Sequence, residues 1–300
     1  KRIVDYTSYM VAAILAAPFV RRPDIVVATS PLLFTAMAGC VVGGMRRIPF
    51  VFELRDIWPE SIKAVGAMGD SAVIRFFERI EMALYRRAAL IVSVTRSFKQ
   101  RLVERGVPAA KIRVVTNGVD LGRFHPMAKD PALERELDVA GKFVAGYIGT
   151  HGMAHALGTL LAAADILRQR PDGADVHLLL IGAGAEKENL EAEARRRGLD
   201  NVTFVPPVPK EEIARYWALL DATIIHLRRT ALFQTVIPSK LFEAMGMGIP
   251  VLMGVAGEAA GIVETEAVGL CFTPEDASEL VETLLRLKND APLRDRKSVV

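Results

Sequence analysis

The segment Pro238 to Val251, PSKLFEAMGMGIPV, joins a helix start to a buried strand. Proline is tolerated in a first helical turn and serine is a good cap, so the pattern predicts a helix that begins near Lys240. The apolar residues after Pro250 have the length and composition of a buried strand. A helix followed directly by such a strand is typical of a parallel α/β sheet.

The same helix start groups the chemistry that a nucleotide diphosphate requires. Unpaired N–H groups and the positive end of the helix dipole attract an anion, and Lys240 adds a full charge. Glu243 lies one turn further on, where a carboxylate can accept hydrogen bonds from a ribose diol. An ordinary capped helix with a solvated lysine and glutamate remains the alternative for this segment.

Strand-like apolar runs alternate with helical patterns along the whole chain, which predicts parallel βα units. We expect strands at 25–28, 50–53, 90–94, 113–116, 143–148, 177–181, 202–204, 222–225, 250–253 and 269–272. The clearest expected helices are 72–88, 97–105, 158–168, 186–198, 210–219, 240–247 and 277–288, and a further buried helix is expected at 32–44.

Composition bounds the class of protein. The 300 residues are 51% hydrophobic and 24% charged, which describes a globular protein with an ample core. The net charge of +3, without a basic run interleaved with aromatic residues, argues against nucleic acid as a partner. Cys40 and Cys271 lack CxxC spacing, which predicts buried free thiols in the cytoplasm. The uncharged stretch 25–45 is broken at Ser30-Pro31 and predicts a strand and a helix instead of a membrane span.

Strand periodicity stops between Asn117 and Ala140, where glycines, prolines and charges gather. We therefore predict a first α/β domain over 1–126, a linker over 127–138 and a second α/β domain over 139–294. The carboxyl ends of the strands would then bound a cleft between the domains.

Two glycine-rich turns follow strands of the second domain. The first runs Gly146-Tyr-Ile-Gly-Thr-His-Gly152 and the second Gly182-Ala-Gly-Ala-Glu-Lys187. Either could be a tight strand-to-helix turn, but glycine also lets the backbone approach a phosphate closely. Together with Lys240 they form three glycine or lysine sites on one sheet edge, which favours a ligand.

Other polar residues also follow strands. Gly257 and Glu258 come after the strand 250–253, where Glu258 is a candidate for hydroxyl contacts or, alternatively, a helix-capping acid. Arg55 and Asp56 follow the strand 50–53 and could handle a sugar hydroxyl or a leaving phosphate, unless they form a local ion pair. His151 has no metal-ligand spacing, so we assign no metal site and expect it to line the cleft.

Several strings together resemble the retaining GT-B glycosyltransferases of family four, in particular bacterial N-acetylfucosaminyl transferases of O-antigen and surface-polysaccharide assembly. The matching strings are FELRDIWPES, TNGVDLGRFHP, GYIGTHG, LIGAGAEKENL, PSKLFEAMGMGIPV and GEAAGIVE, and they cover nearly the whole chain. The resemblance implies two Rossmann-like domains with parallel sheets that face a cleft.

The resemblance also implies a reaction and residue roles. A sugar would move with retention from a nucleotide-diphosphate donor, a UDP-N-acetylamino sugar, to a lipid-linked or polysaccharide acceptor, without a metal or cofactor. Lys240 and Lys187 would neutralise the diphosphate, Glu243 would hold the ribose, and Asp56, Arg55 and Lys240 would serve catalysis. The donor site would comprise Gly149, Thr150, His151, Gly182, Gly184, Lys187, Pro238, Ser239, Lys240, Leu241, Glu243, Gly257 and Glu258.

The chain departs from the family pattern at identifiable places. Thr235 stands where the family often has a donor-sugar glutamate, and GTHGMAHALG lacks the usual arginine and lysine, for which Lys240 would compensate. The first domain lacks the family's opening strand, glycine-rich loop and helix, so we expect it to be incomplete. The segment 295–300, DRKSVV, interrupts a helical pattern and is predicted to be a non-native tail.

A membrane surface and two other functions remain open. Arg75, Arg79, Arg86 and Arg87 flank Phe76, Phe77 and Leu84 on one expected helix, which could lie on anionic lipid at the inner face of the cell membrane or be a solvated face. The alternatives to a transferase are a non-catalytic nucleotide-sugar-binding or assembly subunit and a GT-B-like nucleotide-sugar epimerase.

Overall fold

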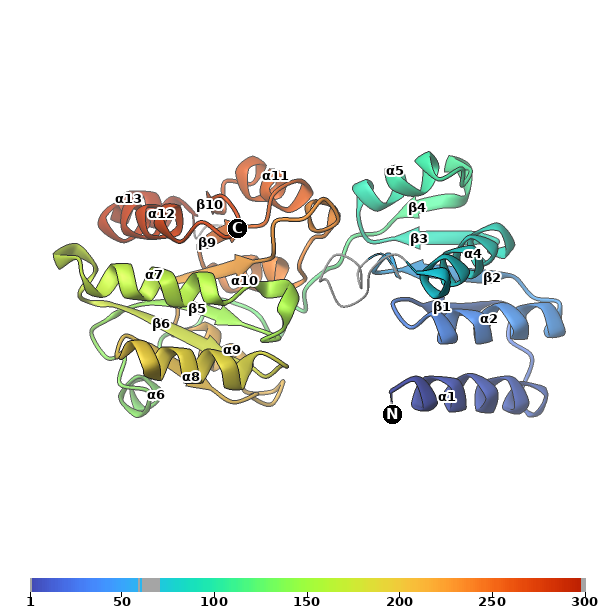
Figure 1. Cartoon of the computed structure of the whole chain (residues 1–300), viewed down its shortest axis with the longest axis horizontal. Helices are drawn as coiled ribbons and strands as arrows, with labels where there is room; N and C mark the ends of the chain where they lie inside the picture. Colours follow the sequence, from blue (N-terminus) through green and yellow to red (C-terminus); the bar gives the residue numbers. More distant parts are fainter. Residues whose placement is uncertain (1, 59, 61–70, 298–300) are drawn as a thin grey trace. The chain divides into compact units, whose positions relative to one another are not determined.

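The computed structural model describes residues 2–58, 60 and 71–297, and the chain forms two compact units (Figure 1). The first unit comprises Lys1–Thr116 and the second Asn117–Val300. Each unit is built around one parallel sheet, of four strands in the first unit and six in the second. The α/β class with two parallel sheets, predicted from the alternating pattern, is confirmed.

The sheet of the first unit follows chain order, β1-β2-β3-β4, with every pair parallel. Its strands are β1 (Val26–Thr29), β2 (Phe50–Leu54), β3 (Leu90–Ser93) and β4 (Ile112–Val114). Its α-helices in the described residues are α1 (Arg2–Ala16), α2 (Leu33–Arg46), α4 (Ala72–Arg87) and α5 (Arg96–Glu104). The hydroxyls of Ser71 and Thr95 cap α4 and α5 by accepting N–H bonds at 3.2 and 2.9 Å, so both helices begin where their sequences predict.

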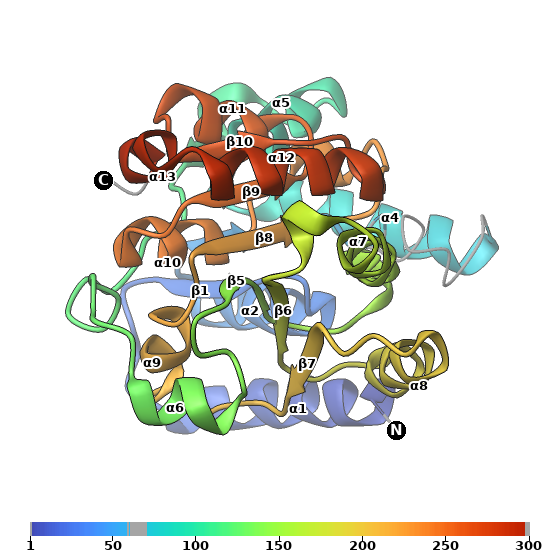
Figure 2. The same cartoon turned by 90° about the vertical axis from the view of Figure 1, so that its left-hand side faces the viewer.

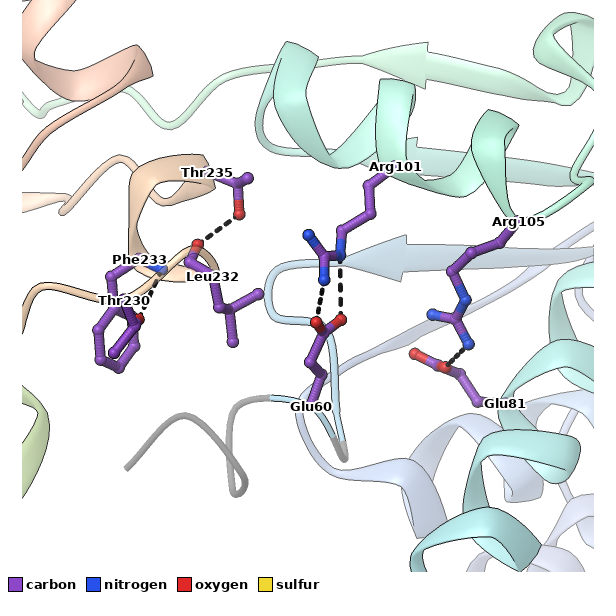
Figure 3. Close-up of polar contacts among 8 residues, drawn as sticks. All are labelled: Glu60, Glu81, Arg101, Arg105, Thr230, Leu232, Phe233 and Thr235. Atoms are coloured by element: carbon purple, nitrogen blue, oxygen red, sulfur yellow. Dashed lines mark hydrogen bonds and ion pairs between the residues drawn. The ribbon is translucent and has the colours of Figure 1, made fainter. Parts of the chain in front are cut away.

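A buried ionic group joins α4 to α5. The Glu81 side chain is only 2% exposed and accepts hydrogen bonds from the Tyr85 hydroxyl and the Arg105 guanidinium, both at 2.6 Å. Figure 3 shows the Glu81–Arg105 pair beside a second pair, Glu60–Arg101. Because both carboxylate oxygens of Glu81 are bonded, this burial of charge is compensated within the fold.

The sheet of the second unit has the order β10-β9-β8-β5-β6-β7, again all parallel. Its strands are β5 (Phe143–Ile148), β6 (Val176–Ile181), β7 (Val202–Val205), β8 (Ala222–His226), β9 (Val251–Gly254) and β10 (Gly269–Cys271). The chain runs outward from β5 to β7 and then returns to the other side of β5 at β8 (Figure 2). The strand order thus reverses between β5 and β8, which is where open α/β sheets bind ligands.

Helices cover both faces of this sheet (Figure 2). They are α6 (Pro131–Glu136), α7 (Gly158–Arg168), α8 (Lys187–Arg197), α9 (Ile213–Trp217), α10 (Lys240–Met247), α11 (Glu258–Thr265), α12 (Ala277–Asn289) and α13 (Ala291–Lys297). Leucines of α7 and α12 pack on β6 in one buried cluster, so the strands are apolar on both faces as their sequences predict.

Every expected strand is present within two residues of its predicted bounds, and most expected helices agree as closely. The exception is 210–219, where only Ile213–Trp217 is α-helical. The residues before it form a turn in which the Pro209 carbonyl accepts N–H bonds from Glu212 and Ile213. None of the helices in the described residues is long and apolar enough to span a membrane.

The boundary between the units differs from the predicted linker. The division falls between Thr116 and Asn117, ahead of the predicted domain end at 126, and α6 occupies much of the predicted linker 127–138. The segment belongs to the second unit because it packs there. Phe124 is buried against Gly246, and Lys129 Nζ lies 2.8 Å from Asp221. The polar residues of the predicted linker therefore belong to the surface of the second unit.

The predicted non-native tail, residues 295–300, overlaps α13, which runs to Lys297. The last three residues of the tail lie outside the described residues.

Candidate functional site: the carboxyl edge of the second sheet

The loops after β5 and β6 lie in direct backbone contact at the carboxyl edge. Gly149 N–H donates to Ile181 O at 2.9 Å, and Gly182 N–H donates to Val205 O at 3.0 Å. Gly182 has φ +143°, and a Cβ there would lie 1.9 Å from Gly149 O. A Cβ on Gly184 would similarly lie 2.2 Å from His151 O. These two predicted donor-site glycines are thus required by loop packing, whether or not a ligand is bound.

Gly149 is different because it makes room for a side chain. With φ +147°, it leaves a space in which a Cβ would lie 2.5 Å from Lys240 Nζ. The Lys240 amino group also lies 3.8 Å from the ring centroid of Tyr147, a cation–π contact. The Tyr147 hydroxyl donates to Thr150 O at 2.8 Å, which fixes the ring, while Thr150 itself is exposed. The structure therefore places Gly149 beside Lys240, with Thr150 linked to both through Tyr147, and their donor-binding role stays a prediction.

Within the residues that the structure describes, no carboxylate lies at bonding distance from the Lys240 amino group. Its Nζ is buried and has no hydrogen-bond partner among the described residues. Burial lowers the pKa of Lys240 to about 7, and the nearby Glu243 carboxylate opposes this shift. A buried ammonium without a bonded anion is costly, and cations in protein interiors are normally paired. An anionic ligand beside Gly149 would complete this group.

The start of α10 also leaves backbone donors unused. Ser239 has helical dihedrals and makes no side-chain cap, so the predicted serine cap is wrong. Instead, Leu241 and Phe242 donate to the carbonyls of Pro238 and Ser239 in a tight first turn, at 3.0 and 3.1 Å. Among the described residues, the N–H groups of Ser239 and Lys240 have no backbone acceptor. Leu241 has a bonded N–H and a side chain in the core, so its predicted donor contact is not supported.

Glu243 lies one turn further along α10 and is half-buried. Burial raises the pKa of its carboxyl group, and the positive charges of Lys240 and Arg123 oppose the shift. Glu243 thus lies near the charge of Lys240, and its role as a hydrogen-bond acceptor for a ribose stays a prediction.

Lys187, the second predicted diphosphate ligand, already donates hydrogen bonds to two backbone carbonyls. Its Nζ donates to Gly182 O at 2.9 Å and to Val205 O at 3.1 Å, at the carboxyl ends of β6 and β7. The Glu191 carboxylate lies 3.9 Å away on the next helical turn. These contacts give Lys187 a structural role in holding the two strand ends together, and a ligand would have to compete with them.

His151 is enclosed and does not line an open surface. Its side chain is fully buried between Tyr147 and Phe204, with ring centroids at 5.9 and 6.2 Å. Burial lowers its pKa to about 4, and the charges of Lys187 and Lys240 add to that shift. The ring is therefore neutral at pH 7 and packs as an aromatic residue, which corrects the prediction that it lines the cleft.

Thr235, which stands where the family often has a glutamate, bonds to the backbone of its own loop. The Thr235 hydroxyl donates to Leu232 O at 2.6 Å, and Phe233 N–H donates to Thr230 Oγ1 at 3.2 Å (Figure 3). Both bonds close a short 3-10 helix, Phe233–Thr235. Thr235 therefore stabilises its own loop and offers no carboxylate to a donor sugar.

Gly257 and Glu258 stand at the end of β9, where α11 begins. Gly257 has φ +82°, and a Cβ there would lie 2.1 Å from Gln234 O, so this glycine is required by the loop contact. Gly257 borders a cavity of about 390 Å³ at the ends of β9 and β10, together with Gln234 and Arg229. Glu258 is half-buried in the first turn of α11, a position that also suits an acid beside a helix dipole.

Arg55 and Asp56 lie in the first unit, directly after β2. Their N–H groups donate to Ser30 Oγ at 3.1 and 3.3 Å, and Ser30 in turn donates to Asp56 O at 3.0 Å. Arg55 is exposed and lines a cavity of about 430 Å³ with Tyr6 and Tyr9 of α1. The structure thus places both residues at the carboxyl edge of their own sheet, and their catalytic role stays a prediction.

A histidine that the sequence reasoning missed ties three loops of the second unit. His226, at the end of β8, is 1% exposed and lies 2.7 Å through Nδ1 from His155 O. Its Nε2 accepts the Glu275 N–H at 2.9 Å, so Nδ1 is the donor to His155. The Glu275 carboxylate then accepts the Arg229 N–H at 2.7 Å. A histidine inside an apolar strand gives no distinct signal in the sequence.

Comparison with known proteins gives the family. Residues 142–290 match the family model described as glycosyl transferases group 1, and residues 5–118 match the glycosyl transferase 4-like domain. The chain belongs to the group 1 glycosyltransferases. The two matches coincide with the second and first units.

Curated relatives are found in bacterial polysaccharide assembly and in inositol glycosylation. The putative colanic acid biosynthesis glycosyl transferase WcaI of Escherichia coli K12 is 24% identical over 98% of this chain and 75% of its own length. The amylovoran biosynthesis glycosyltransferase AmsK of Erwinia amylovora is 29% identical over 68% of this chain and 48% of its own length. A D-inositol 3-phosphate glycosyltransferase of Segniliparus rotundus is 32% identical over 58% of this chain and 39% of its own length. The chain thus spans half or less of the last two relatives.

Solved structures give the same fold. HepE of Anabaena, solved in complex with UDP and glucose, superposes with a TM-score of 0.77 at 20% identity, over 96% of this chain and 74% of that one. The sucrose-phosphate synthase of Thermosynechococcus elongatus superposes with a TM-score of 0.75 at 20% identity, over 97% of this chain and 71% of that one. The fold is therefore GT-B. The predicted family and fold are confirmed, whereas the N-acetylfucosaminyl subgroup stays a prediction.

Proposed function

We propose that this protein transfers a sugar from a nucleotide-diphosphate donor, a UDP-N-acetylamino sugar, to a lipid-linked or polysaccharide acceptor, with retention of configuration. The observation that carries the proposal is the buried Lys240 Nζ, which has no hydrogen-bond partner in the described part of the chain and lies against Gly149 where the strand order reverses. WcaI and AmsK, which are named for colanic acid and amylovoran biosynthesis, support a polysaccharide acceptor.

The proposed chemistry follows from charge. Breaking the bond between the donor sugar and its phosphate leaves negative charge on the departing diphosphate. Lys240 and the free N–H groups at the start of α10 would stabilise that charge as it develops, without a metal. In this proposal Glu243 binds the ribose, Thr150 reaches the phosphates or the sugar, and Glu258 contacts sugar hydroxyls. Arg55 and Asp56 would act on the acceptor hydroxyl or the leaving phosphate.

Calorimetry with UDP and UDP-sugars, followed by a transfer assay that uses membrane lipid extract as acceptor, tests the proposal. We expect UDP binding and transfer of the sugar to lipid, with the anomeric configuration of the product equal to that of the donor by NMR. Absence of nucleotide binding would overturn the proposal. Binding without hydrolysis or transfer would favour a non-catalytic subunit, and conversion of one UDP-sugar into another would favour an epimerase.

We also propose that the protein works in the cytoplasm, peripherally at the inner face of the cell membrane. On α4, Arg75, Arg79 and Phe76 are exposed, which supports a lipid-facing patch. Phe77 instead packs on Trp58, with ring centroids 5.0 Å apart, and Leu84 is buried. Neither residue therefore belongs to the patch, although the sequence analysis included both. Flotation with anionic vesicles at low salt tests this, and a protein that stays with the unbound fraction contradicts it.

A further inference from the structure

Arg228 occupies the loop after β8, beside the place where the strand order reverses. Its backbone N–H donates to Ala154 O at 2.8 Å, which ties it to the loop after β5. The preceding Leu227 is buried and donates its N–H to Gly254 O at 3.2 Å, at the end of β9. The backbone of Arg228 is therefore fixed between the loops that follow β5 and β9.

Arg228 is half-buried, and one nitrogen of its guanidinium is enclosed by the protein. Its Nε is buried and finds no acceptor in the part of the chain that the structure describes. Arg228 lines a small cavity together with Arg229, Phe233 and Gln234. The next residue, Arg229, is exposed and makes its bond through the backbone, so the two adjacent arginines differ in burial. The enclosed Nε has lost its hydration with no compensating hydrogen bond in the described residues, while the two terminal nitrogens of Arg228 are not enclosed in this way.

Arg228 and Lys240 share this property and this location. Within residues 2–58, 60 and 71–297, they are the two cationic side chains with a buried nitrogen that lacks a hydrogen-bond partner. Both are joined to the same strand and loop, Lys240 through the ring of Tyr147 and Arg228 through Ala154. The loop itself, residues 149–157, contains no lysine or arginine. Positive charge at the end of β5 is thus supplied from the neighbouring strand and helix.

We infer that Arg228 is a second fixed cation for the diphosphate of the nucleotide-sugar donor, an inference that rests on the proposed function. A diphosphate carries enough negative charge for two cations and offers several acceptor oxygens. A guanidinium donates to two phosphate oxygens at once, whereas an ammonium acts as a point charge. Lys240 and Arg228 would then hold the diphosphate from two directions, and both would stabilise it as the leaving group.

The test compares Arg228→Gln with the matched variant Arg229→Gln in the full chain. UDP affinity is measured by calorimetry, and the thermal unfolding midpoint is measured without ligand. Arg228→Gln is expected to weaken UDP binding by about tenfold or more, since it removes a charged hydrogen bond. Its midpoint should be unchanged, because the buried Nε makes no hydrogen bond within the described residues that the fold would lose. Arg229→Gln should leave UDP affinity within about twofold, and Arg228→Lys should recover part of the loss.

Two outcomes would overturn the inference. One is an unchanged UDP affinity in Arg228→Gln. The other is a lowered unfolding midpoint that accompanies the affinity loss, since that would show a structural role for the guanidinium. Absence of UDP binding in the unmodified protein would instead overturn the proposed function, so the two failures are distinguishable.

Discussion

The two units treat a buried charge in opposite ways. In the first unit, the Glu81 carboxylate is closed off by Tyr85 and Arg105, each at 2.6 Å. In the second unit, the buried Lys240 amino group lies over an aromatic ring and beside a glycine, with no hydrogen-bond partner among the described residues. A compensated charge joins two helices, whereas an uncompensated one is the feature expected of an anion site. We therefore interpret Glu81 as serving the fold and propose that Lys240 serves binding.

The largest effect is expected where the compensated pair is broken. Glu81→Ala leaves Arg105 and the Tyr85 hydroxyl without their acceptor in a buried position. We expect the free energy of unfolding to fall by about 3 kcal/mol, because removing one member of a buried pair leaves the other uncompensated. Urea unfolding measures the loss. UDP affinity below the transition should be unchanged, and a loss of less than about 0.5 kcal/mol would show that the pair contributes little.

Lys240→Met should have the opposite profile. The variant removes an unpaired buried charge and keeps the stem of the side chain, so the unfolding midpoint should rise. UDP affinity should fall by about 30-fold, or about 2 kcal/mol, because a charged hydrogen bond to phosphate is lost. Calorimetry and thermal unfolding together give the answer. Lower stability with unchanged affinity would place Lys240 with Glu81 as a structural residue.

The pH dependence of UDP binding sharpens the comparison further. Burial lowers the pKa of Lys240 to about 7, so the free amino group loses its proton above that pH, while a bound diphosphate would restore it. Between pH 7.5 and 9, we expect UDP affinity to fall by up to about tenfold per pH unit. The free energy of unfolding should rise over the same range, because the unfolded chain binds the extra proton. Both slopes should vanish in Lys240→Met, and persistent slopes there would assign them to another group.

Lys187→Met is expected to have the smallest effect. Lys187 was predicted to bind the diphosphate, but its ammonium makes hydrogen bonds within the fold. Its ammonium already bonds the carbonyls of Gly182 and Val205, so the variant should lose about 1 kcal/mol of stability. UDP affinity should change by less than about threefold, far less than in Lys240→Met. A loss of UDP affinity equal to that of Lys240→Met would return Lys187 to the diphosphate site that the sequence predicts.

Much of the site could be predicted because neighbouring residues in the sequence form it. The string PSKLFEA places Lys240 and Glu243 one turn apart on a helix, and a parallel sheet brings the turns at 149 and 182 to one edge. The errors came from contacts that no local pattern records. Ser239 caps nothing, Leu241 faces the core, and His151 is enclosed.

The sequence by itself determined where strands and helices lie along the chain, because hydrophobic periodicity and turn residues act over a few positions. It also determined that a lysine stands at a helix start after Pro238. Only the tertiary structure decided which charges are satisfied. Lys187 and Lys240 look alike as residues, yet one meets two carbonyls and the other meets a ring and a glycine. Burial and hydrogen bonding depend on atoms brought together from distant segments. These contacts distinguish the lysine that holds two strand ends from the lysine that we propose binds the donor.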